Sequence, residues 1–155
     1  PARNSSSPTR KTCSPAVTLD RAARLMWEAD VGSLPVLDDD GRCVGIVTDR
    51  DVCMAAYTQG VALRESRVAS AMTHDVTVCT PDSPLKQVEA LMAPKQIRRI
   101  PVVDETGTVV GIVSLADLAR YSQSSPLHIP SVPGLARTLA TIVQPRTNGA
   151  AHAAE

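Results

Sequence analysis

The chain has 155 residues, with 16 basic and 16 acidic side chains and a formal net charge of zero. This balance argues against nucleic-acid binding, because no strong positive field would drive counterion release from phosphates. Only 2% of the residues are aromatic, which argues against a platform that stacks single-stranded bases. The hydrophobic fraction of 43% suits one packed domain or two small ones. No apolar run approaches the roughly 18 residues of a membrane helix, so we expect no membrane association.

The cysteines and the N-terminus indicate a reducing compartment. The four cysteines show no CxxC spacing and do not form the pattern of a disulfide framework. The N-terminal residues lack the apolar core of a signal peptide, so we expect a cytoplasmic protein with reduced thiols. Residues 1–11 are polar and Ser-rich, which predicts a loosely ordered tail.

Helical and strand patterns alternate along the first half of the chain. Apolar residues recur at helical spacing over residues 19–26, and residues 33–37 form a short apolar strand. The sequence Asp-Asp-Asp-Gly at 38–41 predicts a turn, and the β-branched stretch 43–47 predicts a second strand. Thr48 is a suitable N-cap for a following helix.

The same order returns in the second half. Residues 85–92 repeat the helical pattern, and Pro94 is predicted to end or bend that helix. A second hairpin follows, with its later strand at 109–113 and a helix N-cap at Ser114. Between the halves, residues 68–72 predict a short helical turn and residues 76–78 a leading strand.

The repetition has a constant offset of 66 residues. Cys13–Met54 aligns with Cys79–Arg120 without a gap, and 14 of the 42 pairs are identical. The block Val44–Val47 recurs as Val110–Val113. A unit of about 60 residues buries little surface alone, so we expect the two units to share one core.

The order of helix, [LI]-P-V-[LV]-D, turn glycine and V-G-I-V-[TS]-x-x-D resembles the cystathionine-β-synthase (CBS) domain. Two copies resemble the CBS pair, over about residues 12–122. The segment Thr48–Asp51 resembles a variant common in small stand-alone bacterial CBS-pair proteins. The resemblance implies an α+β fold of two tandem βαββα repeats, related by a pseudo-twofold axis with their sheets face to face.

Four segments follow from this organisation. We expect an N-terminal tail at 1–11, repeats at 12–65 and 66–124, and a C-terminal helix and tail at 125–155. The last segment has an apolar stripe after Pro133-Gly134, which predicts an amphipathic helix of about three turns. The helix would cover the module or serve a partner surface. The residues of its stripe are Leu135, Leu139, Ile142 and Val143.

The resemblance also implies a function. CBS pairs commonly bind adenosine-containing ligands, such as AMP, ATP, NAD or S-adenosylmethionine, in clefts between the repeats, and AMP or ATP is our first choice. The chain would then be a sensor that needs no cofactor, changes its packing on binding and so modulates a separate partner protein. The family often forms disk-like homodimers, and we expect a homodimer here. No catalytic constellation is present in the sequence, so we predict that the chain is not an enzyme.

The Ser/Thr-x-x-Asp segments are the first candidate site. A carboxylate offers two acceptors for the two hydroxyls of a ribose, and the helix N-terminus beside it favours a phosphate. The resemblance implies that Asp51 and Asp117 accept from the ribose. The same spacing is a capping box, and both roles remain open. The other candidates here are Thr48 and Ser114 beside the carboxylates and Arg50 for a phosphate. The resemblance also implies that Ile46 and Ile112 contact the base.

A basic pair, Arg98-Arg99, is the second candidate site. In the family, basic residues just before the I-P-V strand often bind phosphates, although strand alternation means that only one need face a ligand. An ion pair with an acidic turn is the alternative. The equivalents in the first copy are Gly32 and Ser33, while Ala116 stands where the first copy has Arg50. The copies would either pool their cations around one polyphosphate or form two unequal sites.

Two other functions remain open. The predicted leading strand at 76–78 aligns with the polar residues 10–12 of the first copy. The resemblance implies that this arm helps to enclose the base pocket, so we expect a weaker pocket in the first copy, which would suit a ligand-free interaction scaffold. A metal- or redox-responsive regulator would use the equivalent Cys13 and Cys79, although buried structural thiols are the usual reading. The three histidines have no zinc spacing, and we predict no metal site.

Overall fold

The computed structural model describes residues 11–124 and 131–144. The chain folds into two compact units, unit 1 with residues 1–83 and 100–112 and unit 2 with residues 84–99 and 113–155. This division cuts across the sequence repeat, because most of the second hairpin belongs to unit 1. The backbone amide of Cys43 donates to the carbonyl of Gly107 at 3.3 Å, which links the two hairpins inside that unit.

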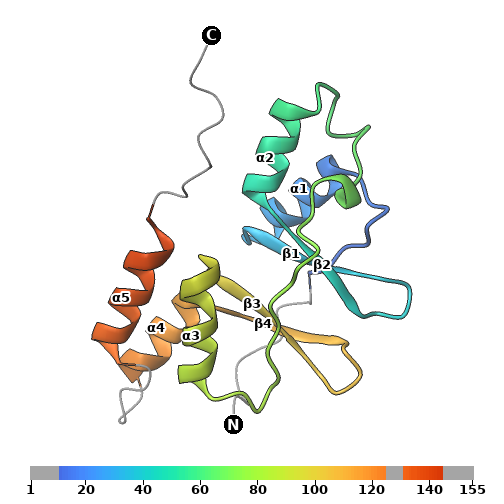
Figure 1. Cartoon of the computed structure of the whole chain (residues 1–155). Helices are drawn as coiled ribbons and strands as arrows, with labels where there is room; N and C mark the ends of the chain where they lie inside the picture. Colours follow the sequence, from blue (N-terminus) through green and yellow to red (C-terminus); the bar gives the residue numbers. More distant parts are fainter. Residues whose placement is uncertain (1–10, 125–130, 145–155) are drawn as a thin grey trace. The chain divides into compact units, whose positions relative to one another are not determined.

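The first repeat has the predicted order of helix, strand pair and helix (Figure 1). The elements are α1 (Leu19–Glu28), β1 (Ser33–Leu37), β2 (Cys43–Thr48) and α2 (Asp49–Thr58). β1 and β2 pair in antiparallel register, with Ser33 opposite Thr48 and an irregularity between Val36 and Leu37. The turn between the strands depends on Gly41, whose φ of 80° is the left-handed conformation that glycine adopts without strain. The short helical turn predicted after α2 is η1 (Val68–Ser70).

The core of unit 1 lies between the two helices and the hairpin. Leu19, Ala22 and Met26 form the inward stripe of α1 at helical spacing. They belong to a buried cluster with residues from both strands, α2 and η1: Leu34, Val36, Val47, Val52, Ala55 and Val68. The hairpin is therefore held against the helices by the same residues that the sequence pattern predicted to be apolar.

The second repeat has the same elements at the same offset. They are α3 (Leu85–Lys95), β3 (Arg99–Val103), β4 (Val109–Ser114) and α4 (Leu115–Ser124). Pro94 lies in the last turn of α3, and the helix ends one residue later, as predicted. The residue after the helix, Gln96, has a φ of 51°, and its equivalent Asp30 has a φ of 52°. The repetition therefore extends to backbone conformations that non-glycine residues seldom adopt.

The strand predicted over residues 76–78 is absent. Only Cys79 pairs, through a parallel bridge to Val102, and Cys13 makes the equivalent bridge to Val36. The amide of Val76 instead donates to the carbonyl of His74 at 3.0 Å, which closes a local turn. Each leading β element is therefore a single bridge, and the described arms of the two repeats are alike. Residue 10, which belongs to the predicted weak arm, lies outside the described residues.

The predicted C-terminal helix is present as α5 (Val132–Ile142). It lies beside α3 and α4 (Figure 1) and buries Leu135 and Ile142 of the predicted stripe. Leu139 and Val143 of that stripe remain 45% and 56% exposed. Among the described helices, none is both long and apolar enough to cross a bilayer.

Candidate functional site

Thr48 and Asp51 form a complete capping box at the start of α2. The amide of Asp51 donates to Oγ1 of Thr48 at 3.2 Å. The amide and the hydroxyl of Thr48 both donate to Oδ2 of Asp51, at 2.8 and 2.7 Å. One carboxylate oxygen thus satisfies the cap, whereas Oδ1 of the half-buried Asp51 has no hydrogen-bond partner among the described residues. The capping interpretation is therefore confirmed, and it leaves an acceptor available for a ligand.

Ser114 and Asp117 form the same box at the start of α4. Oδ2 of Asp117 accepts from the amide and the hydroxyl of Ser114 at 2.8 and 2.6 Å, and the amide of Asp117 donates to Oγ of Ser114 at 3.1 Å. Here the second oxygen is engaged as well, because Oδ1 accepts from the guanidinium of Arg120. The two boxes have the same three hydrogen bonds and differ in the availability of their second carboxylate oxygen.

Arg120 is a residue that the motif comparison missed. It stands three residues after Asp117 on α4, the spacing at which opposite charges meet on a helix surface. Its equivalent in the first repeat is Met54, which cannot pair with Asp51. The Asp-x-x-Arg spacing is readable in the sequence, and it is the signal that could have revealed the pair.

The basic pair lies next to the second box. The amide of Leu115, the residue after Ser114, donates to the carbonyl of Arg98 at 2.8 Å. Arg98 is exposed, while Arg99 is half-buried at the start of β3. In the first repeat the amide of Asp49 makes the equivalent hydrogen bond, to the carbonyl of Gly32 at 3.2 Å. Because glycine stands in place of Arg98, this position has no cation in the first repeat. In that repeat the candidate cation is Arg50, whose side chain is exposed in the first turn of α2.

The two strand isoleucines differ in exposure. Ile46 is half-buried, and its backbone exchanges hydrogen bonds of 3.0 and 2.9 Å with Thr73. Ile112, its equivalent on β4, is 37% exposed.

The equivalent cysteines are buried thiols. Cys13 and Cys79 are 8% and 6% exposed. Burial raises the pKa of the Cys13 thiol to about 11 and also raises the pKa of Cys79. A protonated thiol is a poor nucleophile and a poor metal ligand. Among the described residues, no three His, Cys, Asp or Glu side chains are grouped in a way that could hold a metal ion.

Comparison with known families identifies both repeats. The profile of the CBS domain matches residues 7–57 and again 68–124. The chain belongs to the CBS domain family and contains a tandem CBS pair.

Small proteins and solved CBS pairs are among its relatives. The CBS domain-containing protein YhcV of Bacillus subtilis is 39% identical over 114 residues, which cover 74% of this chain and 79% of that protein. The CBS domain pair of protein MJ0100, solved with 5′-methylthioadenosine and S-adenosyl-L-methionine, has a TM-score of 0.67 and 28% identity, over 77% of this chain and 91% of that one. Hypoxic response protein 1 of Mycobacterium tuberculosis is 33% identical over 104 residues, covering 67% of this chain and 72% of that protein.

Other relatives are much longer. Homoserine O-acetyltransferase of Methanohalobium evestigatum is 31% identical over 109 residues, and the match spans 70% of this chain but only 21% of that enzyme. The similarity therefore concerns about a fifth of the enzyme's length.

Proposed function

We propose that this CBS pair is a regulatory module that binds an adenosine-containing ligand, with AMP or ATP as the first choice. One observation supports it most directly. Each capping box uses a single oxygen of its aspartate, and in the first box the other oxygen is available. The adenosyl ligands in the MJ0100 pair are consistent with this class of ligand.

The proposed roles follow the chemistry of each side chain. Asp51 accepts hydrogen bonds from the ribose, and Thr48 orients its carboxylate through the cap. Asp117 and Ser114 have the same roles in the second box. Arg50, Arg98 and Arg99 stabilise phosphates, because guanidinium groups bind phosphate oxygens in a planar, bidentate way. Ile46 and Ile112 contact the base.

The ion pair of Asp117 makes the two boxes unequal. A ribose at the second box must compete with Arg120 for Oδ1, whereas a ribose at the first box meets a free oxygen. We therefore assign the tighter ribose contact to Asp51. We assign the stronger phosphate contacts to the second repeat, because the basic pair Arg98-Arg99 is present only there.

Ligand binding would act on a partner rather than on a substrate. A ligand shifts a conformational equilibrium only by its differential affinity for the two states, and a charged phosphate supplies such a difference. We infer a non-catalytic protein of the cytoplasm that works as a homodimer, needs no cofactor and modulates a separate protein in signal transduction. We infer the homodimer from the resemblance to CBS pairs, which often form homodimers.

Titration calorimetry with AMP, ATP, NAD and S-adenosylmethionine tests the proposal. We expect binding of at least one ligand, and Asp51→Ala should weaken it about tenfold or more, the value of charge-assisted hydrogen bonds. Asp49→Ala is the matched control, since it removes the same charge from the same helical turn outside the box. The proposal is refuted if none of the ligands, at millimolar concentration, gives a heat of binding or shifts the melting temperature.

The second candidate function is a ligand-free interaction scaffold. The engagement of Asp117 by Arg120 favours it, because this pair leaves the second box without a free carboxylate oxygen. A copurified partner that remains bound to the Asp51→Ala/Asp117→Ala variant would support the scaffold over the sensor.

A further inference from the structure

Gln96 joins the C-terminal helix to the end of α3. Its side-chain amide donates to the carbonyl of Thr141 in the last turn of α5 at 3.2 Å, and to the carbonyl of Gln144 just beyond the helix at 3.5 Å. The last carbonyls of a helix have no partner within it, and α5 has no basic side chain in its last turn to supply one. Gln96 therefore caps α5 from a different helix.

Gln96 is also the residue that turns the chain from α3 towards the basic pair. The amide of Gln96 donates to the carbonyl of Ala93 at 3.1 Å. The amide of Ile97 donates to the carbonyl of Met92, also at 3.1 Å, and the two bonds together form the Schellman motif that ends many helices. This motif needs a residue in the left-handed conformation, which Gln96 supplies with its φ of 51°. The turn at Gln96 therefore sets how the chain leaves α3 to reach Arg98.

The first repeat makes the same turn with a residue that is better suited to it. Asp30 has a φ of 52°, and the amide of Val31 donates to the carbonyl of Met26 at 2.9 Å. Aspartate adopts the left-handed conformation more readily than most residues, because its short polar side chain bonds locally. Glutamine lacks this advantage. The second repeat therefore has the more strained residue at the turn and holds its side chain on α5.

The second capping box fixes the other end of the same segment. The amide of Leu115, the residue after Ser114, donates to the carbonyl of Arg98 at 2.8 Å. Residues 96–98 thus run from an anchor on α5 to an anchor on α4, and all of these elements belong to unit 2. The half-buried Arg99 follows directly and begins β3. A change at the α5 anchor is therefore transmitted over no more than three residues to both candidate phosphate-binding side chains.

We propose that Gln96 is a positioning residue, through which the docked α5 holds Arg98 and Arg99 in the arrangement that binds phosphates. The inference rests on the proposed function and adds a regulatory coupling to it. Docking of α5 against α3 and α4 favours phosphate binding, and a bound phosphate favours docking by the same factor. A ligand without phosphates does not contact the basic pair, so its affinity does not depend on α5.

Calorimetry of the full chain with ATP and with adenosine tests this inference, because the two ligands differ only in the phosphates. The double variant Leu135→Glu/Ile142→Glu places charges at two buried positions of α5 and should release the helix. We expect its affinity for ATP to fall about fivefold or more, the usual size of a coupling between two sites. Its affinity for adenosine should stay at the value of the wild type.

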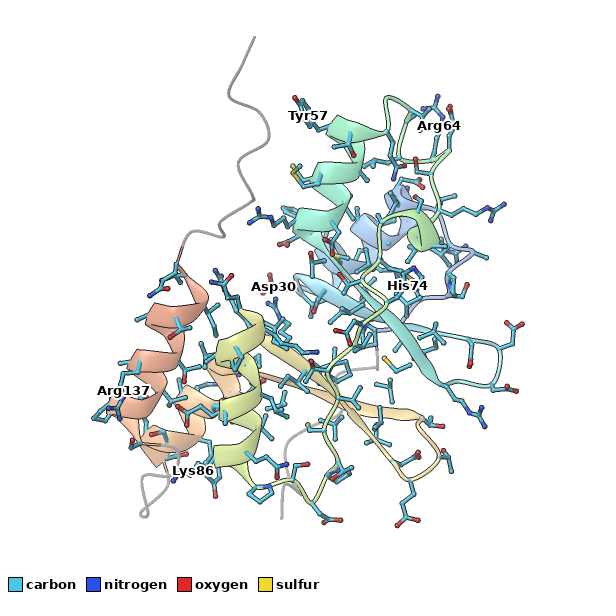
Figure 2. All side chains as sticks on the ribbon, in the orientation of Figure 1. Asp30, Tyr57, Arg64, His74, Lys86 and Arg137 are labelled. Carbon is cyan, nitrogen blue, oxygen red and sulfur yellow. The ribbon has the colours of Figure 1, made fainter. Side chains whose placement is uncertain are left out.

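Arg137→Glu is the matched control for the released helix. It changes the charge of α5 by the same amount as the double variant, and the side chain that it replaces is exposed. Figure 2 shows Arg137 on the side of α5 that points away from α3 and α4. We expect this variant to bind both ligands as the wild type does.

The substitution Gln96→Gly tests the route of the coupling. Glycine adopts the left-handed conformation without strain, so the turn would no longer depend on its anchor on α5. In this background, Leu135→Glu/Ile142→Glu should cause no further loss of ATP affinity. A general loss of structure on release of α5 would instead weaken ATP binding equally in both backgrounds.

Hydrogen exchange of the α5 amides in the wild type gives a second readout that needs no variant. Saturating ATP should slow this exchange by the factor that calorimetry assigns to release of the helix, because the coupling is reciprocal. Saturating adenosine should leave the exchange unchanged. The same measurement without ligand shows whether α5 is released in the double variant.

The outcomes separate this inference from the function on which it rests. A wild type that does not bind ATP would refute both. ATP affinity that survives release of α5, adenosine affinity that falls with it, or α5 exchange that ignores ATP would refute the coupling alone. An equal effect of release in the Gln96→Gly background would refute Gln96 as the route.

Discussion

The hydroxyl of Thr138 donates a hydrogen bond to the buried carboxylate of Glu89 at 3.0 Å and so joins α5 to α3. The same carboxylate lies against the first turn of α5, where a Cβ added to Gly134 would meet Oε1 of Glu89 at 3.1 Å. A negative group near a helix N-terminus is stabilising. Glycine at position 134 therefore permits the approach that holds the C-terminal helix in place.

We expect Glu89→Ala to lower the free energy of unfolding by about 1–3 kcal/mol, because a buried hydroxyl loses its partner. A double-mutant cycle with Thr138→Val measures the coupling in chemical denaturation. Thr141→Val is the control, since the Thr141 hydroxyl donates only within its own helix, to the carbonyl of Arg137. Additive effects of Glu89→Ala and Thr138→Val would contradict this contact.

The equivalent glycines of the two V-G-I-V blocks should respond differently to alanine. A Cβ at Gly45 would stand 2.8 Å from Sδ of Met72 and 3.2 Å from the carbonyl oxygen of Thr73. At Gly111 the nearest atom is Cβ of Val102, at 3.9 Å. We expect Gly45→Ala to destabilise by about 1–3 kcal/mol through overpacking, and Gly111→Ala to be near neutral. Thermal unfolding of the two single variants tests this prediction. Equal melting temperatures for Gly45→Ala and Gly111→Ala would contradict the close packing at Gly45.

Removal of Arg120 should free the second box. Arg120→Ala leaves Oδ1 of Asp117 without its ion pair, and we expect tighter binding of adenine nucleotides by several fold. Stability should change by less than about 1 kcal/mol, since the pair is exposed. Arg64→Ala is the matched control, because it removes a cation paired with Glu65 outside both boxes. Calorimetry should show the gain for Arg120→Ala only, and identical titrations for the two variants would argue against competition at Asp117.

The buried Cys13 thiol should make stability fall at alkaline pH. Burial raises the pKa of Cys13 to about 11 from an ordinary value near 9, so the unfolded chain ionises first. The contribution of this thiol is complete below pH 9 and is lost as the pH rises to about 11. Denaturation at pH 8 and pH 10.5 should show a smaller loss for Cys13→Ala than for wild type, with the exposed Cys53→Ala as the control. The same loss in all three proteins would refute the role of burial.

The repeat and its elements could be predicted from the sequence because they depend on local patterns. Helical spacing over residues 19–26 and the turn glycine at 41 each specify a conformation without reference to the rest of the chain. The leading strand at 76–78 was predicted wrongly, because β-branched residues favour a strand but do not ensure that the backbone forms ladder hydrogen bonds with its neighbour. The amide of Val76 had already been satisfied by His74.

The candidate site was predictable in part for the same reason. Thr48 and Asp51 are three residues apart, and a capping box is a local structure. The hydrogen bond from Thr138 to Glu89 joins residues that are 49 apart in the sequence, so no spacing rule could give it. The roles of the nine proposed ligand-binding residues stay predictions until binding is measured.

Because α5 packs against α3 and α4, the part of the chain that the CBS profile matches is shorter than the part that packs together. The family profile ends at residue 124, yet Leu115 inside it lines a groove together with residues of α5, a helix that begins at Val132. A fragment cut at the profile boundary would leave Leu115 and the buried carboxylate of Glu89 without their contacts to α5. A fragment that ends at the profile boundary should therefore be less stable and more prone to aggregation than a chain that includes α5.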